Sequence, residues 1–263
     1  PVENRLSELW SIFDFLMPGF LYTYARFSER FETPVVKAGD REALARLARM
    51  TAPFILRRVK QEVLRELPEK NESVLYADMT DEQRRLYRAG LLQARQELEQ
   101  EIGRSGFEKS RMTVLAALTR LRQVCCDPAL CYENYTGGSA KLESCVELLK
   151  EAAAGGHKVL LFSQFTSMLA IIEERLRREG LRFYTLQGST PKERRAAMVE
   201  AFNADDTEVF LISLRAGGTG LNLTGADVVI HYDPWWNVAA QNQATDRAYR
   251  IGQQNPVQVY KLI

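Results

Sequence analysis

The stretch SLRAGGTGLNLTGADVVIHYDPWWNVAAQNQATDRAYRIGQ, residues 213–253, decides how the rest of this sequence is interpreted. It holds a glycine-rich turn, a short apolar run, a tryptophan pair and a segment with two arginines. Glycine-rich backbone can approach a phosphate closely and direct N–H groups at it. Arg247 and Arg250 are three residues apart and would share one face of a helix. Two adjacent guanidiniums suit a single multivalent anion such as a nucleoside triphosphate.

Other parts of a nucleotide site are missing from this sequence. It contains no G-x-x-x-x-G-K-[ST] phosphate loop and no evident carboxylate pair for Mg²⁺. We therefore interpret the two arginines as half of a site whose other half lies elsewhere. The chain begins at Pro1 and ends within the strand-like run VQVYKLI, so we expect both ends to be cuts from a longer protein.

Composition narrows the class of protein. The 263 residues allow one large domain or two small ones, and the net charge of +1 gives no bulk sign of nucleic-acid binding. No apolar run reaches the roughly 20 residues that span a bilayer, and the start has no signal-peptide pattern. The four cysteines form no C-x-x-C pair, which favours buried thiols and predicts no metal site in this chain.

The first 138 residues have mostly helical patterns and no catalytic constellation. One helix is expected to end at Pro18-Gly19. Thr80 is expected to cap a long polar helix, with Gln83 completing a capping box. The basic cluster Arg57-Arg58-Lys60 is either a solvated helix face or a contact with DNA or another lobe.

From Ser139 to Ile263 the pattern changes to alternating strands and helices. We expect helices at residues 140–153, 167–179, 191–202 and 237–249, and strands at 158–162, 182–186, 208–212, 227–231 and 256–262. The second and third helices are expected to be capped by Thr166 or Ser167 and by Thr190. Apolar strands with crossover helices predict an α/β fold with a doubly wound, mostly parallel sheet. The expected domains are therefore residues 1–138 and 139–263.

Ligands of such sheets bind beyond the carboxyl ends of the strands. The loops at these ends follow Phe162, Leu186, Ile212 and His231, and three of them are rich in hydroxyl, glycine or amide groups. Each loop taken alone is explained by ordinary helix capping. If the loops share one edge, they are better explained as a track of phosphate contacts along a nucleic-acid backbone.

The adjacent tryptophans Trp235 and Trp236 cannot both easily point inward from one turn. Two interpretations remain open: a hydrophobic plug beneath the sheet edge, or a wedge against DNA or a partner lobe.

Four segments carry a resemblance to a known family: KVLLFSQF, LQGSTPKERR, AGGTGLNLTGADVVIHYDPWWN and QATDRAYRIGQ. They resemble motifs IV, IVa, V and VI in the second motor lobe of Swi/Snf-type DNA-translocating ATPases, which are superfamily-two helicase-like motors with RecA-like lobes. Upstream, FILRRVKQEVLRELPEK resembles the family's link between lobes, and LRQVCCDPAL resembles its short segment before the second lobe. This chain has Cys126-Asp127 where the family usually has Asn-His.

The resemblance implies a role for each candidate residue. Arg247 and Arg250 would act as arginine fingers on ATP, and Gln243 would orient the triphosphate or the attacking water. Gly220 and Asn222 would approach the nucleotide. The residues implied to contact DNA are Ser163, Gln164, Gly188, Ser189, Thr219, Trp235 and Trp236. Mg²⁺ would be held by the first lobe.

The resemblance also implies partners. These are double-stranded DNA, the N-terminal motor lobe of the same protein and a protein substrate or partner, with no membrane. The main alternative is a non-catalytic lobe that docks DNA or protein. The compact insertions favour a bacterial or archaeal protein, for which we expect a cytoplasmic location at the nucleoid; a eukaryotic member would be nuclear.

Overall fold

The computed structural model describes residues 5–56, 67–106, 110–214, 216 and 220–263. Two compact units divide the chain, Pro1–Arg65 and Glu66–Ile263, and each is described by itself. The basic cluster Arg57-Arg58-Lys60 lies outside the described residues. Within the described part of the chain, no helix is both long and apolar enough to cross a membrane.

The first unit is a small helical cluster. Its helices are α1 (Leu6–Leu16), α2 (Tyr24–Phe27), a π-helical turn (Ser28–Glu32), α3 (Thr33–Ala38), α4 (Arg41–Thr51) and a 3₁₀ turn (Ala52–Phe54). Its core is formed by Phe13, Leu21, Phe27, Phe31 and Leu47. As predicted, α1 ends just before Pro18-Gly19, where proline cannot continue a helix.

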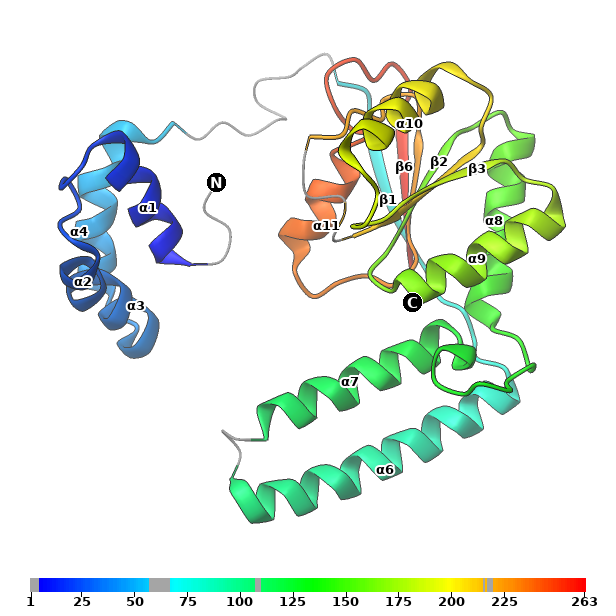
Figure 1. Ribbon diagram of the computed structural model, residues 1–263, viewed down its shortest axis with the longest axis horizontal. Coiled ribbons are helices and arrows are strands. Elements are labelled where there is room, and N and C mark those ends of the chain that lie inside the picture. Colours follow the sequence, from blue (N-terminus) through cyan, green and yellow to red (C-terminus); the bar gives the residue numbers. More distant parts are fainter. Residues whose placement is uncertain (1–4, 57–66, 107–109, 215, 217–219) are drawn as a thin grey trace. The chain divides into compact units, whose positions relative to one another are not determined.

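The second unit contains a six-stranded sheet in which neighbouring strands pair in parallel (Figure 1). In sheet order the strands are β1 (Lys70–Leu75), β6 (Val257–Leu262), β5 (Val228–His231), β2 (Val159–Ser163), β4 (Val209–Ser213) and β3 (Phe183–Leu186). All residues of the central strands β2, β4 and β5 are buried. The predicted doubly wound α/β fold is therefore confirmed.

Helices cover both faces of this sheet. The helices of the second unit that follow the strand pattern are α8 (Ala140–Ala154), α9 (Thr166–Glu179), α10 (Lys192–Ala204) and α11 (Val238–Thr245). Side chains of α8 and α9 pack with Leu161 and Leu211 on one face. Residues of α10 and α11 pack with Leu160 and Phe210 on the other face. Successive strand residues point to opposite faces, so each strand contributes to both cores.

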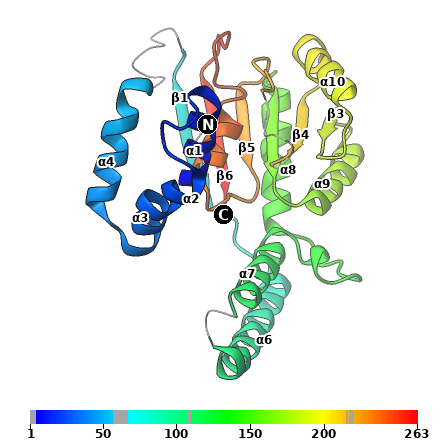
Figure 2. The ribbon, with the colours of Figure 1, turned by 60° about the vertical axis from the view of Figure 1, so that its left-hand side comes forward.

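An antiparallel helix pair, α6 (Asp81–Ser105) and α7 (Arg111–Cys126), projects from the α/β part of this unit (Figures 1 and 2). The strand before this pair, β1, adds to the sheet beside β6, with Lys70 opposite Val257. The sheet therefore includes residues that precede the expected boundary at 138–139, which stays a prediction.

Three expected helix caps can be compared with the structure. Thr80 caps α6 as predicted, because its hydroxyl accepts a hydrogen bond from the Gln83 N–H at 3.2 Å. The Gln83 side chain instead donates to the Val124 carbonyl oxygen on α7 at 2.9 Å. The caps at Thr166 and Thr190 were wrong: α9 already begins at Thr166, and the Thr190 hydroxyl accepts from the Gln187 N–H within its own turn.

We expect Leu211→Ala to destabilise the second unit by about 2–5 kcal/mol, because its side chain is fully buried at the centre of β4. The matched variant is Leu92→Ala on α6, where the leucine is 60% exposed and the loss should stay within about 0.5 kcal/mol. Chemical denaturation followed by circular dichroism measures both. Equal losses in the two variants would contradict the assignment of the core.

Candidate functional site

The four loops singled out in the sequence lie at one edge of the sheet. They follow β2, β3, β4 and β5, and the order β5-β2-β4-β3 makes these strands neighbours. Because all of them run parallel, their carboxyl ends meet at the same edge. Ser163 and Ser213, the last residues of β2 and β4, are directly paired there. The shared edge on which the predicted phosphate track depended is thus present.

The loop after β2 is built around the carboxylate of Asp233. The backbone N–H of Gln164 donates to both carboxylate oxygens of Asp233 at 3.2 Å. The Ser163 side chain is buried and its hydroxyl accepts from the Phe165 N–H at 3.1 Å, so it is already used within the turn. The Nε2 atom of Gln164 is buried without a partner and could donate to a ligand.

Burial raises the pKa of Asp233 to about 6, although hydrogen bonds from Ser163 and Gln164 favour its charged form. The carboxylate is therefore ionised at neutral pH, where it can hold the Gln164 N–H and face the positive charge of Arg122, whose Nη2 lies 4.0 Å from it.

The loop after β3 presents Gly188 and Ser189 to solvent. Its position is set by Arg195 of α10, which the sequence pattern did not single out. The Arg195 guanidinium donates to the carbonyl oxygens of Thr190 at 3.4 Å and of Ala216 at 3.1 Å. It thereby joins the loop after β3 to the glycine-rich loop after β4. Thr219, in that second loop, lies outside the described residues.

A helix was expected over residues 237–249, but the two arginines do not lie on a regular helix. Helix α11 ends at Thr245, and Arg247 and Arg250 occupy the turns that follow. Because the backbone forms turns there and not a helix, the two side chains have different surroundings. Arg247 is only 4% exposed, whereas Arg250 is exposed to solvent.

Electrostatics at this pair favours an anion. Burial, and then the neighbouring positive charge of Arg250, lowers the pKa of Arg247. The Nε–H of Arg247 is buried and has no hydrogen-bond partner, which is costly unless a ligand or water accepts from it. Both the repulsion and the unmet donor would be relieved by a bound polyanion.

Two of the residues predicted to contact the nucleotide, Gly220 and Asn222, lie near Arg250. Arg250 Nη1 donates to the Leu221 carbonyl oxygen at 3.3 Å, which places the arginine beside Gly220 and Asn222. Gly220 has a φ of +53°, a conformation that glycine adopts without strain. Asn222 is exposed, and Gln243 is exposed on α11. Gly220 and Asn222 thus lie beside Arg250, and contact of these residues and of Gln243 with a nucleotide stays a prediction.

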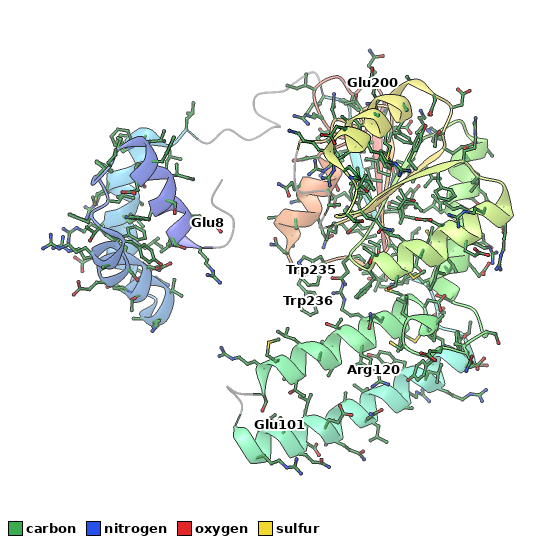
Figure 3. All side chains as sticks on the ribbon, viewed as in Figure 1. Glu8, Glu101, Arg120, Glu200, Trp235 and Trp236 are labelled. Carbon is green, nitrogen blue, oxygen red and sulfur yellow. The ribbon has the colours of Figure 1, made fainter. Side chains whose placement is uncertain are left out.

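The tryptophans form a stack at the loop after β5 (Figure 3). Their ring centroids are 5.1 Å apart and the planes are nearly parallel, at 10°. Trp236 is 54% exposed and Trp235 is half-buried, so Trp236 is not a buried plug. The guanidinium of Arg122 on α7 lies 5.2 Å from the first ring and 5.1 Å from the second. Contact of the stack with DNA stays a prediction.

Among the residues that the structure describes, no group of three or more histidine, cysteine or acidic side chains could hold a metal ion. All four cysteines are free thiols, with Cys126 and Cys145 buried and the other two half-buried. Burial raises the pKa of the Cys145 thiol to about 12, so this thiol is inert at neutral pH.

Comparison with known proteins agrees with this arrangement. A family model described as "SNF2-related domain" matches residues 1–130, and the model "Helicase conserved C-terminal domain" matches residues 140–252. The solved structure of the Sulfolobus solfataricus SWI2/SNF2 ATPase C-terminal domain is similar, with 30% identity and a TM-score of 0.61. The match covers 74% of this chain and 79% of that one. The chain belongs to the SWI2/SNF2 ATPase family. The predicted family and RecA-like fold are therefore confirmed.

Relatives of this SWI2/SNF2 chain occur in bacteria, archaea and eukaryotes. The putative ATP-dependent helicase/translocase YwqA of Bacillus subtilis is 40% identical over all of this chain and 29% of the relative. A SWI/SNF-related regulator of chromatin from Mus musculus is 36% identical over all of this chain and 26% of the relative. The Sulfolobus solfataricus SWI2/SNF2 ATPase core in complex with dsDNA has 35% identity and a TM-score of 0.63, and the match covers 100% of this chain and 56% of that one. The chain spans between a quarter and a third of these curated relatives.

His231, at the end of β5, gives a prediction for pH dependence. Its ring is buried, stacks on Phe162 and forms a hydrogen bond with the Thr245 hydroxyl at 2.9 Å. Burial lowers its pKa to about 4 from an ordinary value of 6.5. The unfolded chain therefore binds a proton first as pH falls, and stability is lost between pH 6.5 and 4. We expect a loss of about 2 kcal/mol between pH 7 and pH 5 from this group.

Two measurements check this. The His231 ring proton should titrate near pH 4 by NMR, and chemical denaturation at the two pH values should show the loss. His157→Gln, which leaves His231 as the remaining histidine of the two, should keep the dependence, and His231→Gln should reduce it. A midpoint near 6.5 for His231 would contradict the buried, neutral ring.

Proposed function

We propose that this chain is the C-terminal motor half of an ATP-dependent translocase or remodeller that acts on double-stranded DNA. The observation that carries the proposal is the arginine pair of a SWI2/SNF2 lobe, one buried with an unmet donor and one exposed, in the turns after α11 and beside Gly220. Such a pair is suited to a polyanion, and the resemblance to motif VI supplies ATP as that anion.

The two arginines divide the work between them. Arg250 is exposed and makes one 3.3 Å bond to a carbonyl oxygen, so it can turn toward the γ-phosphate and act as an arginine finger. A finger of this kind contributes about 10³–10⁵ in rate by stabilising charge in the transition state. Arg247 is held in place by burial and provides a fixed donor to the phosphates. Gln243, one turn earlier, orients the triphosphate or the water.

Mg²⁺ belongs to the same proposal. When bound with ATP it neutralises phosphate charge, and its ligands are expected on the N-terminal lobe. The described residues of this chain offer no acidic or histidine cluster for it.

DNA would run along the loops after β2 and β3. The unpartnered Nε2 of Gln164 and the exposed backbone of Gly188 and Ser189 are suited to phosphate oxygens. Ser163 would act mainly through the turn that its hydroxyl holds. The similar Sulfolobus structure is an ATPase core in complex with dsDNA, which supports this choice of partner. Backbone contacts carry no sequence code, so binding should be salt-sensitive and independent of sequence.

The finer parts of the proposal concern the whole protein. Stepping requires the N-terminal lobe to close on this one when ATP binds and to open after hydrolysis. A protein substrate or partner and a cytoplasmic, nucleoid-associated location in a prokaryote are also proposed. The second candidate, a lobe that docks DNA or protein without turnover, is less favoured because it leaves the unmet donor of Arg247 without a role.

In the full-length protein, Arg250→Ala should lower DNA-stimulated ATP turnover by about 10³-fold or more while nucleotide affinity stays within a few-fold. The reason is that a finger acts on charge that develops only in the transition state. Turnover is measured by phosphate release and affinity by fluorescent-nucleotide titration. Arg178→Ala, an exposed arginine paired with Glu174 on α9, is the control for loss of one charge. Loss of binding with unchanged turnover per bound nucleotide would refute the finger role.

The 263-residue chain by itself should show no ATP turnover above background, with or without DNA, because half of the site lies in the other lobe. The same phosphate-release assay measures this. Adding the N-terminal lobe in one polypeptide should restore DNA-stimulated turnover. Robust turnover by the isolated chain would rule out the half-site.

A further inference from the structure

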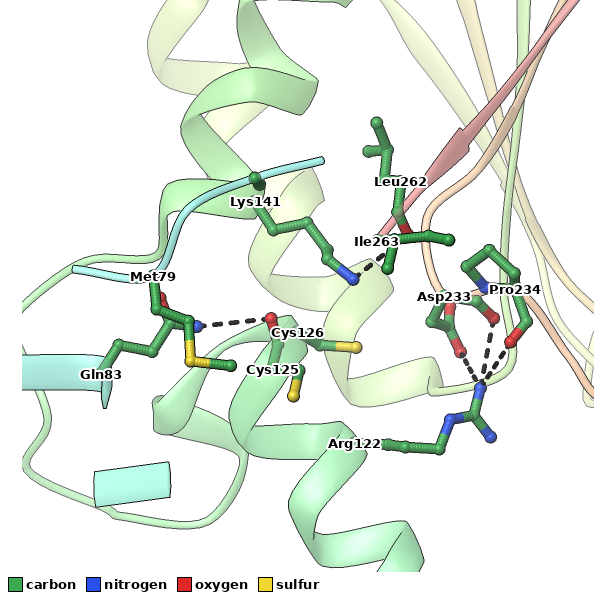
Figure 4. A pocket seen from close by; sticks show the side chains of 11 residues that line it. Met79, Gln83, Arg122, Cys125, Cys126, Lys141, Asp233, Pro234, Leu262 and Ile263 are labelled. Carbon is green, nitrogen blue, oxygen red and sulfur yellow. Dashed lines mark hydrogen bonds and ion pairs between the residues drawn. The ribbon is translucent and has the colours of Figure 1, made fainter. Parts of the chain in front are cut away.

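Arg122, on the last turns of α7, reaches the loop that follows β5 (Figure 4). Its Nη2 donates to the Pro234 carbonyl oxygen at 2.9 Å and to that of Asp233 at 3.4 Å. The same atom lies 4.0 Å from the Asp233 carboxylate. A side chain that is 20% exposed thus donates to two carbonyl oxygens of one short loop and faces a carboxylate of the same loop.

The same guanidinium packs against the tryptophan stack. Its distances to the Trp235 and Trp236 rings, 5.2 and 5.1 Å, nearly equal the 5.1 Å between the rings. The three groups form a near-equilateral triangle, so the cation lies against the stack and not between the rings. The ring of Phe165, from the loop after β2, lies 6.0 Å away. Cation–π attraction of this kind favours one orientation of the two indoles.

The loop held by Arg122 leads directly into α11. Asn237 caps this helix by accepting from the Ala240 N–H at 3.2 Å. Gln241, one turn further, donates its side-chain N–H to the Trp235 carbonyl oxygen. The helix carries Gln243 and ends two residues before Arg247. A continuous series of contacts therefore runs from α7 through the tryptophan loop to the arginine pair.

We propose that Arg122 is a positioning residue that couples the α6–α7 helix pair to the arginine pair through the tryptophan loop, an inference that rests on the proposed motor function. In this role it sets the rate of DNA-stimulated ATP turnover without touching the nucleotide. A tether from the helix pair holds the tryptophan loop, and through it the start of α11, in the arrangement that catalysis needs.

The geometry requires arginine in particular. One planar guanidinium donates to two carbonyl oxygens while its face or edge packs against aromatic rings. A lysine ammonium keeps the charge and three donors but lacks the planar guanidinium that can pack against the rings. Charge alone would act differently, because a lost surface cation weakens DNA binding and leaves the turnover at saturating DNA unchanged.

The test uses the full-length protein with Arg122→Gln, Arg122→Lys and the matched control Arg120→Gln. Arg120 is exposed on the same helix, so the control removes the same charge two residues away (Figure 3). ATP turnover is measured at saturating DNA, together with the KM for ATP, the DNA concentration for half-stimulation and the melting temperature.

We expect Arg122→Gln to lower kcat at saturating DNA by roughly 3- to 30-fold, the range for residues that couple sites without contacting a ligand. The KM for ATP should stay within about twofold, and Arg122→Lys should recover less than half of the loss. Arg120→Gln should match the wild type in kcat. If Arg122→Gln fails to fold, the lysine variant carries the test, because its kcat should still fall.

A double variant distinguishes the route. If Arg122 acts through the stack, adding Trp236→Leu to Arg122→Gln should lower kcat no further than the more severe single change. If the fold-reductions in kcat of the two single variants multiply in the double variant, the inference is overturned in favour of a direct DNA contact. The same holds if the variants change only the DNA concentration for half-stimulation and not kcat.

Equal kcat for Arg122→Gln and Arg120→Gln in an active protein overturns this inference alone. A wild-type protein without DNA-stimulated turnover overturns the proposed function and the inference together.

Discussion

Burial of the central strands on both faces is the constraint on which the rest of the structure depends. Strands such as β2 and β4 have no solvated face, so helices must cover both sides of the sheet, as in other sheets whose strands all run parallel. Parallel strands place their following loops at one edge. The loops after β5, β2, β4 and β3 lie along one edge for this reason, although they are far apart in the sequence.

The attachment of the helix pair to the sheet depends on a second set of interactions. The Cys126 carbonyl oxygen, at the end of α7, accepts from the hydroxyls of Tyr232 at 2.9 Å and Ser139 at 2.7 Å, all within buried surroundings. Arg122 adds the contacts to the tryptophan loop one turn earlier. This chain has Cys126-Asp127 where the family usually has Asn-His. The difference does not remove the two hydrogen bonds that attach α7 to the sheet, because their acceptor is the backbone carbonyl oxygen of Cys126.

Much of the fold could be predicted because its signals are local. Strand residues are continuous apolar runs, and the helix ends are marked by glycine and proline, so the strand bounds differ from the structure by at most one residue for β2 to β6. The cap at Thr190 was wrong because its hydroxyl bonds within its own turn. The cap at Thr166 or Ser167 was wrong because α9 begins at Thr166, with Phe165 at the N-cap. Arg122 and Arg195 were missed, since each lies on a helix whose pattern explains an exposed arginine equally well.

The sequence by itself determined the family, the α/β class and the set of loops that carry the candidate site, because these follow from periodicity and short motifs. Only the tertiary structure decided which of the two arginines is buried, since α11 ends at Thr245 and the turns that follow bury Arg247 but leave Arg250 exposed. It also decided that the tryptophans stack on each other and on Arg122, which lies more than a hundred residues away. Contacts at such separation depend on how the helix pair and the sheet meet, and no local pattern encodes that.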